Sequence, residues 1–289
     1  MKKETRRLLV STAVANVRTR PSHTSELYTQ ALMGTELEVI RTSPDRKWHL
    51  AVLPDGSRGW VRSWYVIRAF RPQLERWRLT LSHRVKTRCA TVYVGPSRRS
   101  QTTCEVSLGV RFAVSRRDRG WVEVRLPDSG SGWVRSSALE SLQGSPPAPE
   151  SLVRTALRFV GAPYLWGGVT PWGCDCSGLV QSVFSFHGIR LPRDSAEQFR
   201  YVRDCLVRGG PQASRPGDLI FFGRSGRTVS HVAISTGWPG FLHAYGCVRT
   251  GSFARGKEGY LPELTRLARG VARLVPETKK DVDKNRVLQ

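Results

Sequence analysis

Two short segments of the chain carry side chains that can perform covalent chemistry. Cys176 follows Cys174 and Asp175, and the imidazoles of His231 and His243 come later in the chain. A thiol is a weak nucleophile until a nearby base accepts its proton or a helix N-terminus stabilises its thiolate. These residues therefore predict covalent acyl transfer, with the thiol of Cys176 as the attacking group.

The residues after Cys176 predict the element that positions it. Apolar side chains at 179, 180, 183, 184 and 186 have helical spacing, so Cys176 is expected in the first turn of a buried helix. The positive end of that helix's dipole favours the thiolate. The order of elements predicts an α+β domain with both histidines on its sheet. Other predicted elements are helices over 150–160 and from Asp194, and strands over 218–222, 229–235 and 241–244.

The N-terminal half contains an internal repeat. Residues 17–22 resemble residues 92–97, and each copy continues to two tryptophans with the same spacing, 48 and 60 in the first copy and 121 and 133 in the second. The second tryptophan of each pair lies in Gly-Trp-Val-Arg-Ser. Short β-rich stretches and Pro-Asp turns surround these landmarks. Each copy is therefore predicted to be a small β-barrel with the tryptophans in its core.

Length and a Pro-rich segment predict the domain boundaries. A chain of 289 residues suits two or three domains, each able to bury a core. Glycine and prolines at 144–149 mark the clearest boundary, and the charged residues at the C-terminus are expected to be disordered. The predicted division is a first barrel over 8–68, a second barrel over 83–141, a linker over 142–150, a catalytic domain over 151–275 and a tail over 276–289.

Five blocks of the C-terminal half resemble the NlpC/p60 cysteine peptidases, and the repeats resemble bacterial SH3-like domains. The resemblance implies a papain-like catalytic domain after two SH3-like barrels. It also implies Cys176 as nucleophile, His231 as general base and His243 as the residue that orients His231. The blocks occur in the family's order: Tyr164-Leu165-Trp166-Gly167-Gly168, 175–180, 192–195, 217–222 and 230–232.

With two SH3-like units in front, the chain is further similar to bacterial γ-D-glutamyl-diamino acid endopeptidases. The resemblance implies a murein peptide substrate with a free N-terminal L-alanine, whose amine is bound by Asp175 together with Glu26 and Tyr65 of the first barrel. An anionic pocket around an ammonium group favours short peptides with a free end over intact wall. The implied substrate-binding residues are Asp175, Ser177, Glu26, Tyr65, Trp166, Asp194 and Ser195.

Other interpretations of these residues stay open at this point. A lone cysteine or strand histidine is usually structural. Cys174, Cys176 and the two histidines offer zinc-ligand types, although Cys-x-Cys lacks the usual ligand spacing. Asp194 suits the N-cap of the following helix as well as a substrate contact, and Tyr65 suits barrel packing. The predicted chemistry itself requires no metal or cofactor.

Composition bears on the cellular setting. The formal net charge of +23 comes from arginines scattered along the chain, which suits a solvated basic surface or attraction to anionic polymers. No basic stripe indicates a specific nucleic-acid partner. The six cysteines show no regular framework and a working thiol needs reducing surroundings, so we expect a cytoplasmic protein. No apolar run approaches the length of a membrane span, and residues 8–10 are interpreted as a strand instead of a secretory signal.

The sequence thus predicts a monomeric or weakly associating cysteine endopeptidase that cleaves the γ-D-glutamyl bond of free murein peptides and releases L-Ala-D-Glu. Two alternatives remain. One is a cell-wall-binding protein with a degenerate peptidase domain, and the other is an exported lysin that acts on intact peptidoglycan. Whether the residue after D-glutamate is diaminopimelate or lysine does not follow from the sequence.

Overall fold

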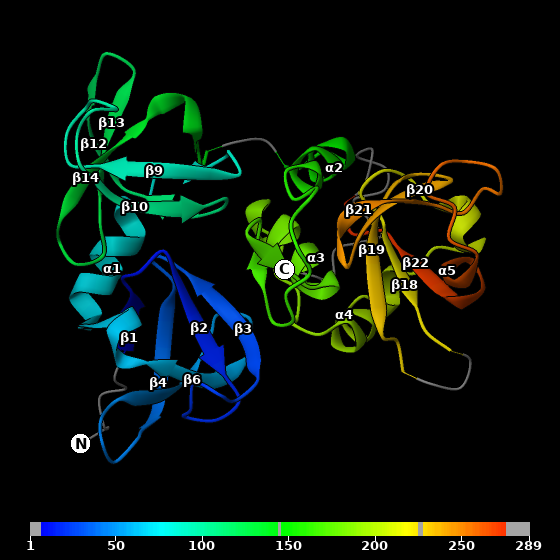
Figure 1. Cartoon of the computed structure of the whole chain (residues 1–289), viewed down its shortest axis with the longest axis horizontal. Coiled ribbons are helices and arrows are strands. Elements are labelled where there is room, and N and C mark those ends of the chain that lie inside the picture. Colours follow the sequence, from blue (N-terminus) through cyan, green and yellow to red (C-terminus); the bar gives the residue numbers. More distant parts are fainter. Residues whose placement is uncertain (1–6, 144–145, 225–227, 276–289) are drawn as a thin grey trace. The chain divides into compact units, whose positions relative to one another are not determined.

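The computed structural model describes residues 7–143, 146–224 and 228–275 (Figure 1). The chain divides into two compact units, Met1–Gly144 and Ser145–Gln289. The predicted α+β fold with SH3-like barrels is confirmed. The tail predicted over 276–289 lies outside the described residues.

The first barrel winds antiparallel strands around an apolar core in the order β3-β2-β6-β5-β4-β1-β7. Burial alternates along β2, so Ala15 and Val17 point inward and pack with Leu37 and Val61. Residues 8–10 are buried in a strand of this barrel, as predicted. Its elements are β1 (Arg7–Val10), β2 (Val14–Arg18), β3 (Leu27–Leu32), β4 (Glu36–Thr42), β5 (Trp48–Val52), β6 (Arg58–Arg62), the 3₁₀ turn η1 (Ser63–Tyr65) and β7 (Val66–Ala69).

The second barrel repeats this plan with strand orders β10-β9-β14-β13-β12 and β11-β8-β15. Trp48 and Trp121 are buried at corresponding positions, and Arg62 and Arg135 lie over their rings at 5.3 and 5.0 Å. The prediction of core tryptophans is confirmed. The elements are β8 (His83–Val85), β9 (Cys89–Tyr93), β10 (Thr102–Ser107), β11 (Arg111–Phe112), β12 (Val114–Asp118), β13 (Trp121–Arg125), β14 (Ser131–Arg135), η2 (Ser136–Ala138) and β15 (Leu139–Ser141).

Helix α1 (Arg71–Thr80) joins the barrels and was not predicted. The indole of Trp77 lies against Gly34 and donates a hydrogen bond to its carbonyl at 3.4 Å. Gly34 has φ of +79°, and a Cβ there would meet the indole at 3.0 Å. Met33 of the first barrel packs into the core of the second, so the two barrels bury apolar surface together.

The C-terminal unit packs helices on an antiparallel sheet with the order β21-β20-β19-β18-β22. Helix α3 contacts β19 and α2 (Figure 1). The predicted helices and strands are confirmed to within a few residues, whereas β21, α5 and β22 were not predicted. The elements are α2 (Pro149–Leu157), β16 (Val169–Thr170), β17 (Gly173–Cys174), α3 (Cys176–Phe186), α4 (Ser195–Tyr201), η3 (Arg203–Cys205), η4 (Gly210–Ala213), β18 (Leu219–Phe222), β19 (His231–Gly237), β20 (Gly240–Tyr245), β21 (Cys247–Ser252), α5 (Pro262–Leu267) and β22 (Ala268–Ala272).

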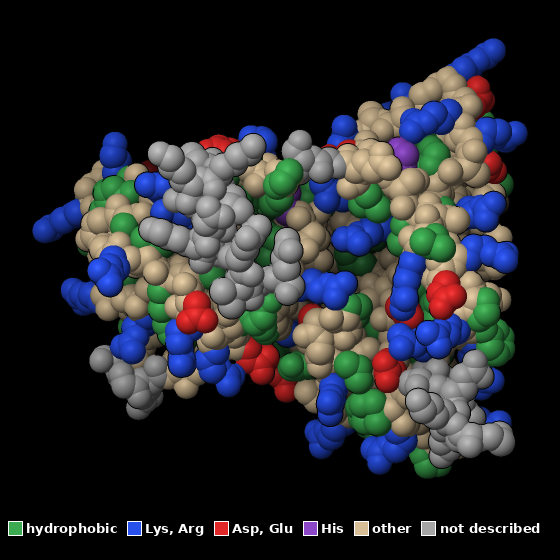
Figure 2. All heavy atoms as spheres, turned by 180° about the vertical axis from the view of Figure 1, so that it is seen from behind, with side chains coloured by type: hydrophobic (Ala, Val, Ile, Leu, Met, Phe, Trp, Pro, Cys, Tyr) green, Lys and Arg blue, Asp and Glu red, His purple; other side chains and the backbone are tan. Residues whose placement is uncertain are grey.

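Basic side chains are spread over the visible face in Figure 2 and do not gather there on one element. All six cysteines lie in the described part of the chain, and each carries a free thiol. Among the described residues, no helix is both long and apolar enough to span a bilayer.

Candidate active site

The thiol of Cys176 sits at the first residue of α3, against the neighbouring strand. The residue is 7% exposed, and the nearby backbone N–H groups of Ser177 and Val232 act to lower the pKa of its thiol. Val232 directly follows His231 on β19, so the helix start and the strand bring thiol and imidazole together. The N–H of Cys176 itself has no partner among the described residues. It is therefore a free donor at a helix N-terminus, suited to an oxyanion.

The two predicted histidines form a hydrogen-bonded pair. Nε2 of His231 and Nδ1 of His243 are 3.0 Å apart, with the rings almost perpendicular. Nδ1 of His231 is then the nitrogen available to the thiol. For His231 to accept the thiol proton there, its own proton must be on Nε2 and be donated to His243. This hydrogen bond is suited to the orienting role that the resemblance implies for His243.

Burial disfavours isolated charges in this site. It raises the pKa of the Cys176 thiol to about 11, with a further rise from the charge of Asp175. It lowers the pKa of His231 to about 4 and that of His243 to about 3, the latter also through the charges of His231 and Arg249. A thiolate or an imidazolium alone is therefore unfavourable, and the two charges form together by proton transfer from Cys176 to His231. The helix dipole predicted to stabilise the thiolate is thus opposed by burial.

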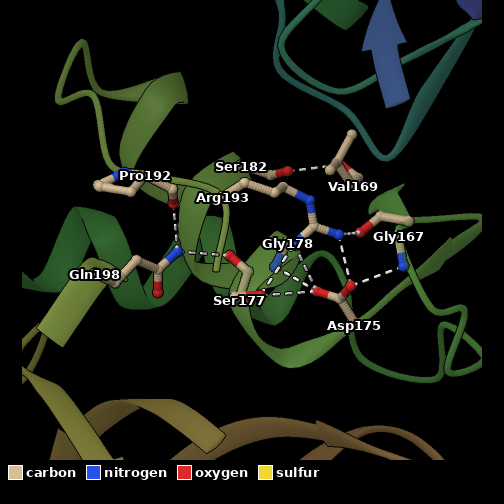
Figure 3. A network of polar contacts seen from close by, with 10 residues as sticks. Gly167, Val169, Asp175, Ser177, Gly178, Ser182, Pro192, Arg193 and Gln198 are labelled. Carbon is tan, nitrogen blue, oxygen red and sulfur yellow. Dashed lines mark hydrogen bonds and ion pairs between the residues drawn. The ribbon is translucent and has the colours of Figure 1, made fainter. Parts of the chain in front are cut away.

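The carboxylate of Asp175 is held by the protein's own donors (Figure 3). It caps α3 through the Gly178 N–H at 2.7 Å and accepts the Gly167 N–H at 2.8 Å. The guanidinium of Arg193 bonds both carboxylate oxygens, one at 3.0 Å, and also the hydroxyl of Ser177 at 2.9 Å. Arg193 is 2% exposed, so this is a buried ion pair. Asp175 therefore positions the nucleophile's helix.

This network changes the role expected of Asp175. Its oxygens are occupied and its charge is offset by Arg193, which leaves little capacity to bind a substrate ammonium. The neighbouring Asp194 is different. It stands at the N-cap position of α4, but its side chain makes no cap hydrogen bond, and it is exposed. Within the described residues its carboxylate has no hydrogen-bond partner, so Asp194 is the aspartate available to a cation.

Glycines allow the Trp-Gly-Gly loop to lie directly on the helix start. A Cβ on Gly178 would overlap the carbonyl oxygen of Gly168, and a Cβ on Gly168 would overlap that of Gly173. Gly167 has φ of +78°, which places its N–H toward Asp175. The loop and the start of α3 are thus in direct backbone contact.

Two contributors to the site were not assigned from the sequence. Burial raises the pKa of the Tyr164 hydroxyl to about 12, and the charges of Cys176 and Asp175 raise it further, so this hydroxyl lies within electrostatic reach of the nucleophile. Gln198, fully buried, donates to the carbonyls of Ser177 at 3.1 Å and Pro192 at 2.9 Å. Tyr164 opens a block that was quoted for its resemblance, but its proximity to Cys176 depends on the fold.

The other predicted site residues lie in separate places. Trp166 is 59% exposed in the loop beside Asp175, and Ser195 opens α4. Glu26 is exposed at the start of β3, and Tyr65 ends η1 and packs partly against the first core; both belong to the N-terminal unit. In the described part of the chain, no group of three or more His, Cys, Asp or Glu side chains is arranged to hold a metal ion.

A buried thiol at a helix start, an imidazole from the adjacent strand and a second residue orienting that imidazole define a cysteine hydrolase. Comparison with known protein families identifies the kind of cysteine hydrolase. Residues 161–261 match the NlpC/P60 family, and residues 13–67 and 86–140 each match a bacterial SH3 domain. The chain therefore carries an NlpC/P60 cysteine peptidase domain preceded by two bacterial SH3 domains.

Similar proteins come from Bacillus species. A γ-D-glutamyl-L-lysine dipeptidyl-peptidase of Bacillus cereus is 34% identical over 54% of this chain and 47% of its own length, so the match spans about half of that relative. The protein of the same name from Bacillus subtilis is 26% identical over 75% of this chain and 72% of its own length. The crystal structure of an NlpC/P60 family protein from Bacillus cereus has the same fold, with a TM-score of 0.81 at 22% identity over 93% of this chain and all of that one.

Proposed function

We propose that this protein hydrolyses the γ-D-glutamyl-diamino acid bond of free murein stem peptides that begin with an unblocked L-alanine. The observation that carries the proposal is Cys176 at the start of α3, beside the His231–His243 pair. The names of the Bacillus relatives support the scissile bond. The six free thiols suit a reducing compartment, and we propose the cytoplasm as the site of action.

The proposed reaction proceeds through a thioester. The sulfur of Cys176 attacks the γ-carbonyl carbon of D-glutamate while its proton passes to His231. The Cys176 N–H stabilises the oxyanion, and His231 then protonates the leaving α-amine as the C–N bond breaks. Water, deprotonated by His231, attacks the thioester. The C–S bond breaks, L-Ala-D-Glu leaves as the free acid, and the proton returns to the sulfur.

An exposed carboxylate at the start of α4 supports selection for a free amine. The charges of Asp175 and Arg193 offset each other, and Asp194 next to them adds a carboxylate that makes no cap hydrogen bond. We propose that Asp194 binds the ammonium of L-alanine, and we keep the roles that the resemblance implies for Glu26 and Tyr65 as separate proposals. The two barrels supply an internal comparison, because the second barrel has Gln101 and Ala138 where the first has Glu26 and Tyr65. The barrel fold therefore does not itself require these two residues.

If these residues bind the N-terminal ammonium, their substitution should reduce the enzyme's selectivity for peptides with a free amine over N-acetylated peptides. Wild type should cleave L-Ala-γ-D-Glu-diaminopimelate at least about 100-fold faster than its N-acetylated form, because a charged hydrogen-bonding group left unpaired costs a factor of roughly 10 to 100 per contact. Glu26→Gln, Tyr65→Ala and Asp194→Asn should each reduce that ratio. The first two substitutions introduce the residues of the second barrel, and a thermal unfolding measurement on Tyr65→Ala separates lost binding from lost packing against the first core.

Product mass spectrometry on both peptides, and on purified sacculi, separates the alternatives. Equal cleavage of the free and acetylated peptides would remove the roles of Glu26, Tyr65 and Asp194. Release of peptides from sacculi would support the lysin, and no cleavage of any substrate would support the wall-binding protein.

We propose the Tyr164 hydroxyl as a second donor for the oxyanion, so Tyr164→Phe should lower kcat by roughly 10- to 100-fold. The raised pKa of Tyr164 keeps its hydroxyl protonated up to about pH 12, so the effect should be the same across the assay range. Steady-state kinetics at several pH values measure this. Tyr201→Phe, an exposed residue that ends α4, serves as the matched control. A Tyr164→Phe enzyme with unchanged kcat would show that the hydroxyl takes no part in the reaction.

A further inference from the structure

Strands β20 and β21 lie side by side (Figure 1). This hairpin carries an arginine and a tyrosine on the same face as the catalytic His243. His243 pairs directly with Arg249 across the two strands, and Tyr245 lies two residues after His243. Residues opposite each other in an antiparallel pair share a face, as do residues two apart in one strand. His243, Tyr245 and Arg249 therefore lie on one face of the hairpin.

Ring contacts confirm this shared face. The Tyr245 ring is parallel to that of His243, with centroids 6.4 Å apart. The guanidinium carbon of Arg249 lies 5.9 Å from the centre of the Tyr245 ring. Its charge is also one cause of the lowered pKa of His243, so its field reaches that imidazole.

The arginine is accessible and its charge is not neutralised. Tyr245 is 66% exposed and Arg249 is exposed, whereas His243 is 1% exposed. Arg249 forms no ion pair with any acidic side chain of the described residues. An exposed cation on an aromatic ring contributes only about 0.5–1 kcal/mol to stability. The pair is thus better suited to binding an anion than to holding the hairpin together.

The leaving amino acid lies next to His231, the hydrogen-bond partner of His243. His231 protonates the leaving amine, so that amine is within hydrogen-bond reach of His231. The α-carboxylate of the leaving residue is attached to the same carbon as the amine and therefore stays close to His231. The guanidinium of Arg249 lies near the Tyr245 ring, and the Tyr245 ring lies near that of His243, so ring contacts connect it to the catalytic pair. Only a group at the far end of the leaving residue's side chain reaches it.

We propose that Arg249, supported by Tyr245, is a specificity-determining residue that binds the carboxylate at the far end of the leaving residue's side chain. Diaminopimelate has such a carboxylate and lysine has only an ammonium there, so Arg249 selects diaminopimelate. This inference rests on the proposed function, because it names the residue that follows the scissile bond. It assigns this chain a preference that differs from the L-lysine in the names of its Bacillus relatives.

The test compares two tripeptides, L-Ala-γ-D-Glu-diaminopimelate and L-Ala-γ-D-Glu-L-lysine, with the full-length enzyme. Wild type should prefer the diaminopimelate peptide by at least about tenfold in kcat/KM. Arg249→Gln should lower kcat/KM for that peptide by roughly 10- to 100-fold, mainly through KM, so the ratio falls toward one, since the lost bond is charge-assisted. Arg249→Lys should keep part of the preference. Arg255→Gln, beyond the opposite end of β21, is the control and should keep all of it.

The outcomes separate this inference from the function on which it rests. If wild type cleaves both peptides at equal rates, or if Arg249→Gln slows both in the same proportion, the Arg249 assignment is wrong and the peptidase assignment stands. If wild type cleaves neither peptide, the proposed function is overturned and the Arg249 assignment with it.

Discussion

Cys176→Ala should abolish cleavage of the free murein tripeptide, with kcat falling by roughly 10⁴-fold or more. Alanine removes the only atom that can form the thioester, and loss of a nucleophile in related chemistry costs factors of this order. Any residual rate above that of the peptide in buffer should come from substrate binding and the oxyanion donor. Mass spectrometry of the products after incubation with wild type and variant measures the change directly.

Cys174→Ala is the matched control for this experiment. Cys174 is fully buried two residues before the nucleophile, on strand β17, and has no part in the proposed reaction. The Cys174→Ala variant should retain the wild-type kcat. Its free energy of unfolding should fall slightly, because the buried sulfur is missing. Turnover by Cys176→Ala would contradict the thiol mechanism. A Cys174→Ala enzyme as inactive as Cys176→Ala would point to a different role for the pair of thiols, such as the zinc site considered above.

The position of the nucleophile was predictable because its signals are local. Apolar residues recur at helical spacing after Cys176, and the helix observed begins there with Asp175 as its N-cap. The catalytic histidines lie on β19 and β20, where short apolar runs predicted strands. The tandem barrels were equally predictable, because the repeated Gly-Trp-Val-Arg-Ser motif marks the same buried strand in each copy.

The role of Asp175 was not predictable, because it depends on a contact between distant parts of the chain. An aspartate before the nucleophile looks the same in sequence whether it is free or neutralised. In the structure the carboxylate is neutralised, because Arg193 from the loop before α4 forms an ion pair with it. The same reasoning applies to Asp194, whose predicted cap position was correct but whose side chain does not cap the helix.

The positions of Arg249 and Tyr164 near the catalytic residues were also not predictable from the sequence. Arg249 becomes a neighbour of His243 only through the register of β20 and β21, and β21 was not predicted. Tyr164 approaches Cys176 because its loop lies on the start of α3 through glycine contacts. Local sequence patterns thus predicted the positions of the reacting groups. The residues that surround these groups come close to them only through contacts between distant parts of the chain.

Arg193→Met should destabilise the catalytic unit and also inactivate it. Removal of one partner of a buried ion pair leaves an uncompensated charge on Asp175 and lowers the free energy of unfolding by about 3–5 kcal/mol. The corresponding fall in Tm is roughly 10 °C. Differential scanning calorimetry of the full chain measures it. Adding Asp175→Asn should restore part of the stability, because the amide still caps α3 but carries no charge.

The loss of activity distinguishes positioning from stability alone. Asp175 and Arg193 hold the loop and helix start that flank Cys176, so kcat should fall by roughly tenfold or more even at temperatures where the variant is fully folded. Arg273 provides the matched control. It forms a similar pair with buried Asp218, with contacts of 3.0 and 2.8 Å, between the segments before β18 and after β22. Arg273→Met should therefore lower Tm and leave kcat unchanged in the folded enzyme. If both variants lose stability but neither loses kcat, the Asp175–Arg193 pair supports only the fold, and the nucleophile is positioned by the backbone contacts of Gly168 and Gly178.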